Sequence, residues 1–180
     1  MLEGEEKLIE SAKRGESLSF SALYDHYLPP IYRFVYLKVS NREMTEDLTH
    51  EVFLSAWQNL ASYKSQGFPF SSWLYQIARN KVIDHYRLQR DHSTLEEVDS
   101  NFIKAEFALE AYIDQEITLE GVKEAIRQLT SDQQDVLIMK FIEDLSHEEI
   151  ARVLEKSEGA VRLIQHRALK ELKKMFGSDV

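Results

Sequence analysis

The sequence contains no cysteine, only three prolines and six glycines, and no long apolar run. Without cysteine the chain can form neither a disulfide nor a thiolate metal site. No stretch approaches the roughly 18 to 20 apolar residues that span a bilayer, so stable membrane insertion is not expected. The first residues are acidic and amphipathic and lack the layout of a secretion signal. We therefore expect a soluble, cytoplasmic protein.

Patterns typical of catalysis are also missing. The six histidines are scattered without a metal-ligand spacing such as HExxH, and there is no glycine-rich phosphate loop or nucleophile elbow. Carboxylates are abundant, but abundance alone does not make an active site. We expect no catalytic residue, no metal and no cofactor, and so no enzyme.

Charge is plentiful but unevenly placed. The net charge is −9, which by itself opposes binding to phosphates. Residues 91–124 carry ten acidic side chains against only Lys104 and Lys123, a net charge of −8. The rest of the chain is nearly neutral, with basic clusters at 79–90 and 156–174. This pattern is compatible with a DNA-binding protein that avoids indiscriminate binding.

Helical periodicity dominates the chain, without convincing period-2 alternation. We expect an all-α protein of two small helical domains, at 1–90 and 119–180, joined by an acidic linker at 91–118. Because proline disrupts a helix interior, we expect a kink or a restart at Pro29-Pro30. The pattern predicts helices at 4–14, 18–39, 43–61, 72–90, 119–129, 132–142, 147–154 and 158–176.

The predicted helix at 43–61 has one apolar stripe at helical spacing. Phe53 and Trp57 widen the apolar arc beyond what one core contact needs. Two interpretations stay open. The helix is buried on most of its circumference, or it has one face in the core and a second face that docks a partner helix. The stripe consists of Leu48, Val52, Ala56 and Leu60.

The segment 63–90 interleaves aromatic rings with cations. Its helix is predicted to start at a serine cap, Ser71 or Ser72. Rings can stack on unpaired bases while cations follow the backbone, and the loop 63–70 adds three aromatics that look exposed. The alternative is a solvated basic face with ordinary surface tyrosines. The aromatic-basic side collects Tyr75, Gln76, Arg79, Tyr86, Arg87 and Arg90, with Asn80 at its margin.

The clearest pattern lies at 144–176, which is typical of a helix-turn-helix. A first helix is followed by a short turn at 155–157 and a second helix with an apolar back and a basic front, which fits the DNA major groove. The predicted back consists of Val161, Ile164, Ala168, Leu172 and Met175. The predicted front consists of Arg162, Leu163, His166, Arg167, Lys170, Lys173 and Lys174.

Polar residues mark the starts of the helices in this part of the chain. Ser146 with Glu149, and Ser131 with Gln134, have the spacing of a capping box. Ser157 is the expected N-cap of the last helix.

Three stretches, DLTHEVFLSAW, SSWLYQIARNKVIDHYR and LSHEEIARVLEKSEGAVRLIQHRALKEL, together resemble bacterial RNA polymerase sigma factors of the extracytoplasmic-function (ECF) group. The resemblance covers about residues 5–90 and 119–176. It implies a protein without enzymatic activity of its own that binds core RNA polymerase, at the clamp helices and the flap, and promoter DNA. The first domain would recognise and melt the −10 element, and the second would recognise the −35 element. An anti-sigma factor is implied as a further partner.

Carried over by position, the resemblance assigns three sets of residues. The expected polymerase-binding residues are Asp47, His50, Glu51 and Trp57. The expected −10 contacts are Tyr63, Arg79, Asn80, Tyr86, Arg87 and Arg90, with Tyr63 and Asn80 near a flipped base. The expected −35 contacts are Lys156, Arg162, Leu163, His166, Arg167 and Lys170.

Several positions depart from the family's pattern. His50 stands where the family usually has glutamine, and Gln165 lies toward the apolar side of its helix. Leu163 and Ile164 replace a commonly polar or basic pair, and facing DNA Leu163 could contact only a thymine methyl group. Glu155 occupies a turn position that is often glycine. If that position requires a positive φ, glutamate costs about 1 kcal/mol there.

Two other classes of protein compete with this interpretation. A helix-turn-helix regulator that binds duplex DNA without polymerase would explain the last 60 or so residues, but not the aromatic-basic segment at 72–90. A helical adaptor that binds only protein is disfavoured by the basic recognition face. For the acidic linker, nucleic-acid mimicry within polymerase and a solvated tether remain equally open.

Overall fold

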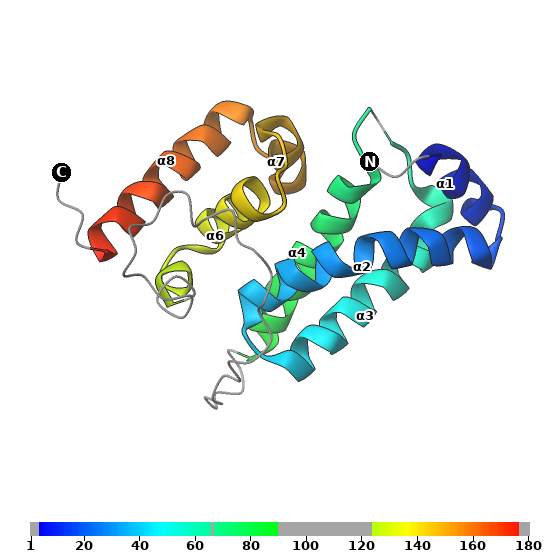
Figure 1. The fold of residues 1–180 in the computed structure, drawn as a ribbon, viewed down its shortest axis with the longest axis horizontal. Coiled ribbons are helices and arrows are strands. Elements are labelled where there is room, and N and C mark those ends of the chain that lie inside the picture. The colour runs from blue at the N-terminus through cyan, green and yellow to red at the C-terminus, as the bar shows by residue number, and fades with distance from the viewer. Residues whose placement is uncertain (1–3, 66, 90–123, 177–180) are drawn as a thin grey trace. The chain divides into compact units, whose positions relative to one another are not determined.

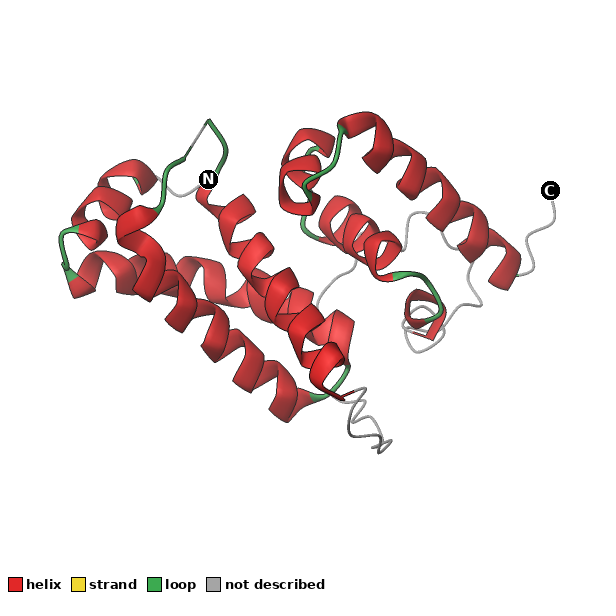
Figure 2. Ribbon diagram, turned by 180° about the vertical axis from the view of Figure 1, so that it is seen from behind, coloured by secondary structure: helices red, strands yellow, loops and turns green. Residues whose placement is uncertain are grey.

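The computed structural model describes residues 4–65, 67–89 and 124–176. Every regular element in these ranges is a helix (Figure 2), which confirms the all-α prediction. The chain divides into two compact units, Met1–Glu97 (unit 1) and Val98–Val180 (unit 2). The predicted linker at 91–118, and Arg90 before it, lie outside the described residues.

Unit 1 packs four helices around one core (Figure 1): α1 (Glu5–Lys13), α2 (Ser17–Val39), α3 (Arg42–Asn59) and α4 (Phe70–Gln89). A single 3-10 turn, η1 (Leu60–Ser62), follows α3. Helix α2 contacts each of the other three helices, so its apolar side chains form the centre of the unit. Side chains that are almost completely buried in this core include Leu23, Ile31, Phe34, Leu60, Phe70 and Leu74.

Helix α2 continues through Pro29-Pro30, so the helix does not restart there. Each proline removes one backbone donor and disfavours the preceding helical turn. Tyr27 and Ile31, on either side, are buried in the core. Tertiary packing on both sides of the pair offsets the local cost.

Helix α4 begins at Phe70, ahead of the predicted serine caps, so that cap prediction is wrong. Phe70 is 2% exposed, and its ring packs against Tyr63 and Trp73 with centroids 5.2 and 5.4 Å apart. The N–H of Ser72 already donates to the carbonyl of Pro69, at 3.1 Å, inside the first turn. Burial of an aromatic ring therefore sets the helix start.

Unit 2 contains α6 (Ser131–Leu137), a π-helical turn η3 (Ile138–Ile142), α7 (His147–Leu154) and α8 (Glu158–Met175). The capping box of α6 pairs Thr130 with Gln133, one residue before the predicted Ser131 and Gln134. The backbone N–H of Thr130 donates to Gln133 Oε1 at 3.0 Å.

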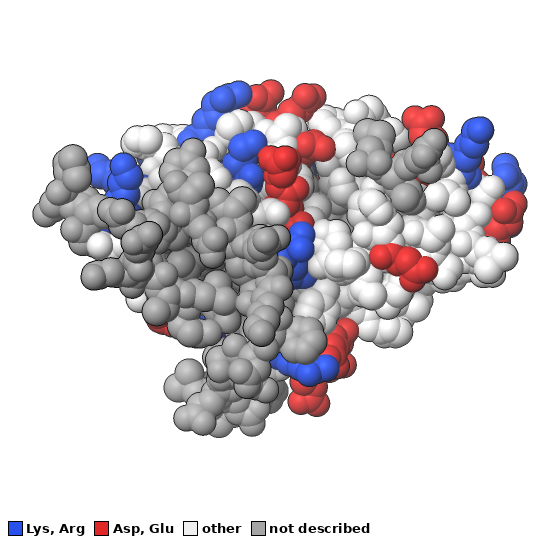
Figure 3. Space-filling model, in the orientation of Figure 1, with Lys and Arg blue, Asp and Glu red and all other residues white. Residues whose placement is uncertain are grey.

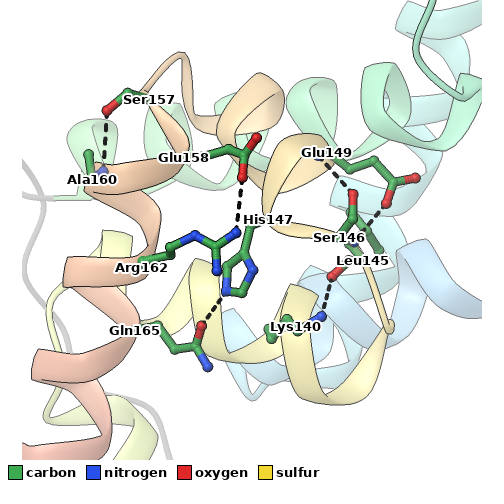
Figure 4. A network of polar contacts seen from close by, with 10 residues as sticks. All are labelled: Lys140, Leu145, Ser146, His147, Glu149, Ser157, Glu158, Ala160, Arg162 and Gln165. Carbon is green, nitrogen blue, oxygen red and sulfur yellow. Dashed lines mark hydrogen bonds and ion pairs between the residues drawn. The ribbon is translucent and has the colours of Figure 1, made fainter.

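The other two predicted caps of unit 2 are confirmed. Ser146 and Glu149 form the capping box of α7, with Ser146 N–H donating to Glu149 Oε2 at 2.7 Å. Ser157 caps α8 by accepting from the N–H of Ala160 at 3.2 Å (Figure 4). Local side-chain chemistry thus fixes where both helices of the helix-turn-helix begin.

Candidate polymerase and nucleic-acid interfaces

Helix α3 buries one side and exposes the other. The predicted apolar stripe, Leu48, Val52, Ala56 and Leu60, is buried. Asp47, His50 and Glu51 are exposed on the other side. The structure therefore favours the second interpretation of this helix, with one face in the core and a second face open to a partner.

Two aromatic residues of α3 that extend its apolar arc differ in burial. Phe53 is 5% exposed and packs edge-on against Tyr24 with centroids 4.7 Å apart, so it belongs to the core. Trp57 is 39% exposed and packs edge-on against Phe20, with centroids 4.8 Å apart. Leu54 beside it is also exposed. The apolar surface of α3 thus continues from the core onto the exposed face.

Glu51 links the exposed surfaces of α3 and α4. The Nζ atom of Lys81 donates to Glu51 Oε2 at 3.0 Å, and both side chains remain accessible to solvent. An ion pair this exposed contributes little to stability, so the contact leaves Glu51 available to a partner.

The aromatic rings of the loop 63–70 are not exposed, contrary to the sequence prediction. Tyr63 is 7% exposed and Phe70 is 2% exposed, while Phe68 is half-buried. Tyr63 packs against Phe70 and Trp73, with its centroid 4.8 Å from that of Trp73. Tyrosine and tryptophan have large apolar bodies, and here the rings cover one another.

Helix α1 completes this aromatic cluster. The Nζ atom of Lys13 lies 5.6 Å from the centroid of the Tyr63 ring. The hydroxyl of Tyr27 donates to the buried carboxylate of Glu5. Burial, with a smaller contribution from Glu5, raises the pKa of Tyr63 to about 12.

Trp73, half-buried over Tyr63, was missing from the predicted site. Its place in SSWLYQIARN was the only signal for it.

The exposed side of α4 is more polar than predicted. Asn80 is exposed and Arg79 is half-buried. Tyr75, expected on this side, is 3% exposed and packs against Phe34 with centroids 5.5 Å apart. Its assignment to the aromatic-basic face is therefore wrong, because α4 packs against both α2 and α3 and so buries a wide arc.

The end of α4 keeps part of the predicted aromatic-basic surface. Tyr86 is 42% exposed, although its hydroxyl donates to the carbonyl of Lys38 at 2.9 Å. Arg87 is exposed and lies 3.5 Å from Asp84. One ring and one cation are thus accessible near the end of this helix.

In unit 2, the turn between α7 and α8 has the positive φ that was considered for Glu155, at a position where the family often has glycine. Glu155 has φ 54° and ends α7 in the left-handed region. Lys156 N–H donates to the carbonyl of Ala151 at 2.9 Å, which closes the turn. The expected cost of about 1 kcal/mol for a non-glycine residue therefore applies at Glu155.

Helix α8 separates an apolar back from a cationic front as predicted. Val161 and Ala168 are completely buried, but Met175, assigned to the back, is 39% exposed. Helix α8 ends at that residue. The exposed front contains Arg162, Leu163, His166, Arg167, Lys170, Lys173 and Lys174.

Carboxylates lie beside some of these cations. Arg162 donates to Glu158 Oε2 at 3.2 Å (Figure 4), and Lys156 lies 3.2 Å from Asp132 of α6. Positive and negative side chains are also mixed on the face shown in Figure 3. This mixing fits a protein whose affinity for phosphates is restrained.

Gln165 has a partner on the other helix of the motif. His147 Nε2 lies 2.6 Å from Gln165 Oε1 and supplies the proton of this hydrogen bond (Figure 4). Both side chains are half-buried. The bond joins the start of α7 to the middle of α8, which satisfies a glutamine placed toward the apolar side.

Within 4–65, 67–89 and 124–176, no cluster of three or more side chains is arranged to hold a metal ion. In those same ranges, no helix combines the length and apolar character that crossing a bilayer requires.

Comparisons with known families match both units. Sigma-70 region 2 matches residues 23–92, and Sigma-70 region 4 matches residues 119–172. The first match contains α3 and α4, and the second contains α7 and most of α8. Both parts of the chain are therefore similar to regions of one class of protein.

Whole proteins are similar to this chain as well. The ECF RNA polymerase sigma factor BldN of Streptomyces coelicolor is 35% identical over 96% of this chain. The match spans 66% of BldN, so the chain covers slightly less than two thirds of that relative. SigX of Bacillus subtilis, another ECF sigma factor, is 31% identical over 87% of this chain and 82% of its own length.

Solved structures agree on the fold. CnrH, in complex with the cytosolic domain of CnrY, has a TM-score of 0.74 at 22% identity, covering 98% of this chain and 99% of that chain. The sigma factor RpoE, in complex with the anti-sigma factor NepR from Bartonella quintana, has a TM-score of 0.73 at 22% identity. That match covers 89% of this chain and 98% of that chain. With both regions matched and SigX similar over most of its length, the chain belongs to the ECF RNA polymerase sigma factors, a family of non-enzymes that direct promoter-specific transcription initiation.

Proposed function

We propose that the chain binds core RNA polymerase through α3 and reads promoter DNA through α4 and α8. The helix-turn-helix carries this proposal, because α8 buries an apolar back and exposes a cationic front after a closed turn. That arrangement suits insertion of α8 into the major groove. Family membership favours this function over an independent duplex-binding regulator.

The exposed face of α3 is the proposed contact for the polymerase clamp helices. Asp47, His50 and Glu51 supply polar groups, and Trp57 supplies a half-exposed ring beside Leu54. A partly exposed aromatic ring bordered by charges has the composition of an interface centre with its polar rim. Unit 2 would contact the flap.

The −10 element is the proposed ligand of the α4 surface. Arg79 and Arg87 would follow the phosphates, and Asn80 would hydrogen-bond an unpaired base. Arg90 stays a predicted contact. Tyr86 offers part of its ring, whereas Tyr63 would act from within the aromatic cluster beneath Trp73.

The −35 element is the proposed ligand of α8. Arg167 and Arg162 would pair with base edges, and Lys170 and Lys156 would contact phosphates. His166 lies on the same exposed face and can donate to either.

We also propose an anti-sigma factor as a partner, by analogy with the CnrH–CnrY and RpoE–NepR complexes. Both complexes contain a protein of this fold held by a second polypeptide. A cytoplasmic location would follow from binding to RNA polymerase.

Reconstitution with sigma-free core polymerase tests the proposal. We expect promoter-dependent transcription when the protein is added, and only weak binding of duplex DNA by the protein alone, because its net charge of −9 opposes phosphate attraction. Tight, sequence-specific binding by the free protein, without polymerase-dependent transcription, would instead identify an independent regulator.

A further inference from the structure

Leu163 is an apolar side chain in the middle of the cationic front of α8. It is 49% exposed, and its exposed neighbours on the helix are His166, Arg167 and Lys170. A lone exposed leucine is ordinary on a protein surface. This leucine differs because it lies on the face that the proposed function inserts into the major groove.

Gly159 lies one helical turn before Leu163, on the same side of α8. A Cβ atom built at Gly159 would meet nothing within 4 Å, and the backbone there is helical. Neither space nor backbone conformation within the protein therefore requires glycine. Gly159 is the second residue of α8, and glycine is less favourable than alanine within helices, by about 0.5–1 kcal/mol in a helix interior. A glycine that the fold does not need suits a point where another molecule approaches the backbone.

Together, Gly159 and Leu163 form a short uncharged stretch in the cationic front of α8, called the notch below. Arg162, beside the notch, is hydrogen-bonded to Glu158 at 3.2 Å. The surrounding cations favour a polyanion as the occupant over an apolar protein segment. In the major groove of duplex DNA, the edges of the base pairs present one apolar group, the 5-methyl group of thymine.

We propose that Gly159 and Leu163 receive a thymine 5-methyl group of the −35 element and so help to determine promoter specificity. This inference rests on the proposed function of α8. Gly159 would let the base pair approach the helix backbone, and Leu163 would cover the methyl group. The notch would thus distinguish thymine from the other three bases by shape and hydrophobicity.

Deoxyuridine tests the inference, because it differs from thymidine only by the missing 5-methyl group. Holoenzyme reconstituted with this protein would first select a −35 sequence from a randomised library. Each thymine of that sequence would then be replaced by deoxyuridine, and the Kd measured by filter binding. We expect one or two replacements to weaken binding roughly three- to fivefold, the value of one buried methyl group. A selected sequence without thymine, or one insensitive to every replacement, would overturn the proposal.

Leu163→Ser would link the effect to this side chain. We expect the variant to bind thymine and deoxyuridine promoters equally, because serine offers no apolar cover. Leu169→Ser is the matched control, since Leu169 is 37% exposed and lies about 120° around the same helix. It should keep the full sensitivity to deoxyuridine. Sensitivity that survives in Leu163→Ser would also overturn the proposal.

Gly159→Ala separates binding from folding. The variant should melt at the same temperature as the wild type or higher, because alanine favours the helix. It should nevertheless bind the selected promoter more weakly, because the new methyl group occupies the notch. Unchanged promoter binding would show that the glycine is not a point of close approach.

Arg167→Ala distinguishes failure of this inference from failure of the proposed function. If Arg167→Ala leaves promoter binding unchanged, α8 does not read DNA and both proposals fail. If Arg167→Ala weakens binding while Leu163→Ser keeps the deoxyuridine effect, only the notch is wrong.

Discussion

The two units of the molecule build their cores from different side chains. In unit 1, rings connect in series from Tyr27 through Phe70 and Tyr63 to Trp73, with centroids 4.8 to 5.7 Å apart. Residues 124–176 contain only two aromatic side chains, Phe141 and Phe176. Their core consists mainly of aliphatic residues.

This difference shows which sequence patterns predict the exposure of side chains correctly. In α8 the contrast is between aliphatic side chains and cations, which partition strongly between core and water. In α4 and the preceding loop the contrast is between aromatic side chains and cations. Tyrosine and tryptophan pack in a core and also occur at surfaces, so the same pattern fits either place. Tyr63 and Tyr75 proved to be buried for this reason.

The largest expected effect tests whether the aromatic core stabilises unit 1 alone. Phe70→Ala should lower the free energy of unfolding of that unit by about 3–5 kcal/mol, because the ring is 2% exposed. Both tryptophans of the chain, Trp57 and Trp73, lie in unit 1, so tryptophan fluorescence reports that unit. Circular dichroism reports both units. Ile150→Ala in unit 2 should leave the fluorescence transition in place, and a shared loss would show that the units unfold together.

Alkaline pH should destabilise unit 1 more than residues 124–176. Burial is the main cause that raises the pKa of Tyr63 to about 12 from its ordinary value of 10.0, and it raises the pKa of Tyr27 as well. The ionised form is thus disfavoured in the folded chain. The contribution of these two tyrosines to the stability of unit 1 is complete below the pKa of tyrosine in the unfolded chain. It is lost as the pH rises from 10 through the pKa of the folded chain.

Residues 124–176 contain no tyrosine and provide the internal comparison. Tyrosinate absorbance during a pH titration would measure the ionisation, and unfolding at each pH would be followed by fluorescence for unit 1 and by circular dichroism for both units. Ionisation of every tyrosine near its ordinary pKa, without loss of stability, would contradict the buried cluster.

Trp57→Ala should distinguish an interface ring from a core ring. We expect binding to core polymerase to weaken by about 2 kcal/mol or more, while the free energy of unfolding falls by only about 1–2 kcal/mol. Phe53→Ala is the control, because Phe53 is 5% exposed and its loss should destabilise the unit far more. Unfolding of the Trp57 variant would mean that this residue belongs to the core.

Promoter assays would distinguish the roles of the two proposed DNA-binding surfaces, α8 in unit 2 and α4 in unit 1. Arg167→Ala should weaken initial promoter binding by about 1–3 kcal/mol if it reads a guanine. Asn80→Ala should leave that step nearly intact and reduce strand opening. A pre-melted −10 bubble should rescue the Asn80 variant more than the Arg167 variant, because the unpairing cost is already met.

Filter binding on duplex and bubble templates, with permanganate footprinting, would measure both steps. Equal rescue of the Asn80 and Arg167 variants, or no rescue of the Asn80 variant, would contradict the assignment of promoter binding to α8 and strand opening to α4.

The smallest expected effect concerns the ion pair between Glu51 and Lys81. Lys81→Met should change the free energy of unfolding by less than about 1 kcal/mol, because both side chains are solvent-accessible. Glu51→Gln should weaken polymerase binding with a similarly small effect on folding. Chemical denaturation and a core-binding titration would compare the two. A large loss of stability in the lysine variant would assign Glu51 to the fold.

Much of the candidate site could be predicted because it lies on regular helices. Periodicity placed the buried stripe of α3 and the exposed cations of α8 correctly. The spacing of Ser146 and Glu149 identified a capping box, since that bond is local. The start of α4 could not be predicted in this way, because a ring buried against distant residues decides it.

By itself, the sequence determined the helical class, the helix-turn-helix and the likeness to sigma factors, because these depend on spacing within single segments. Only the tertiary structure decided the burial of Tyr63, the continuity of α2 through Pro29-Pro30 and the bond between His147 and Gln165. Each of these depends on residues that are distant in the chain. Burial against several partners can outweigh a local preference, and local spacing carries no record of which partners will be there.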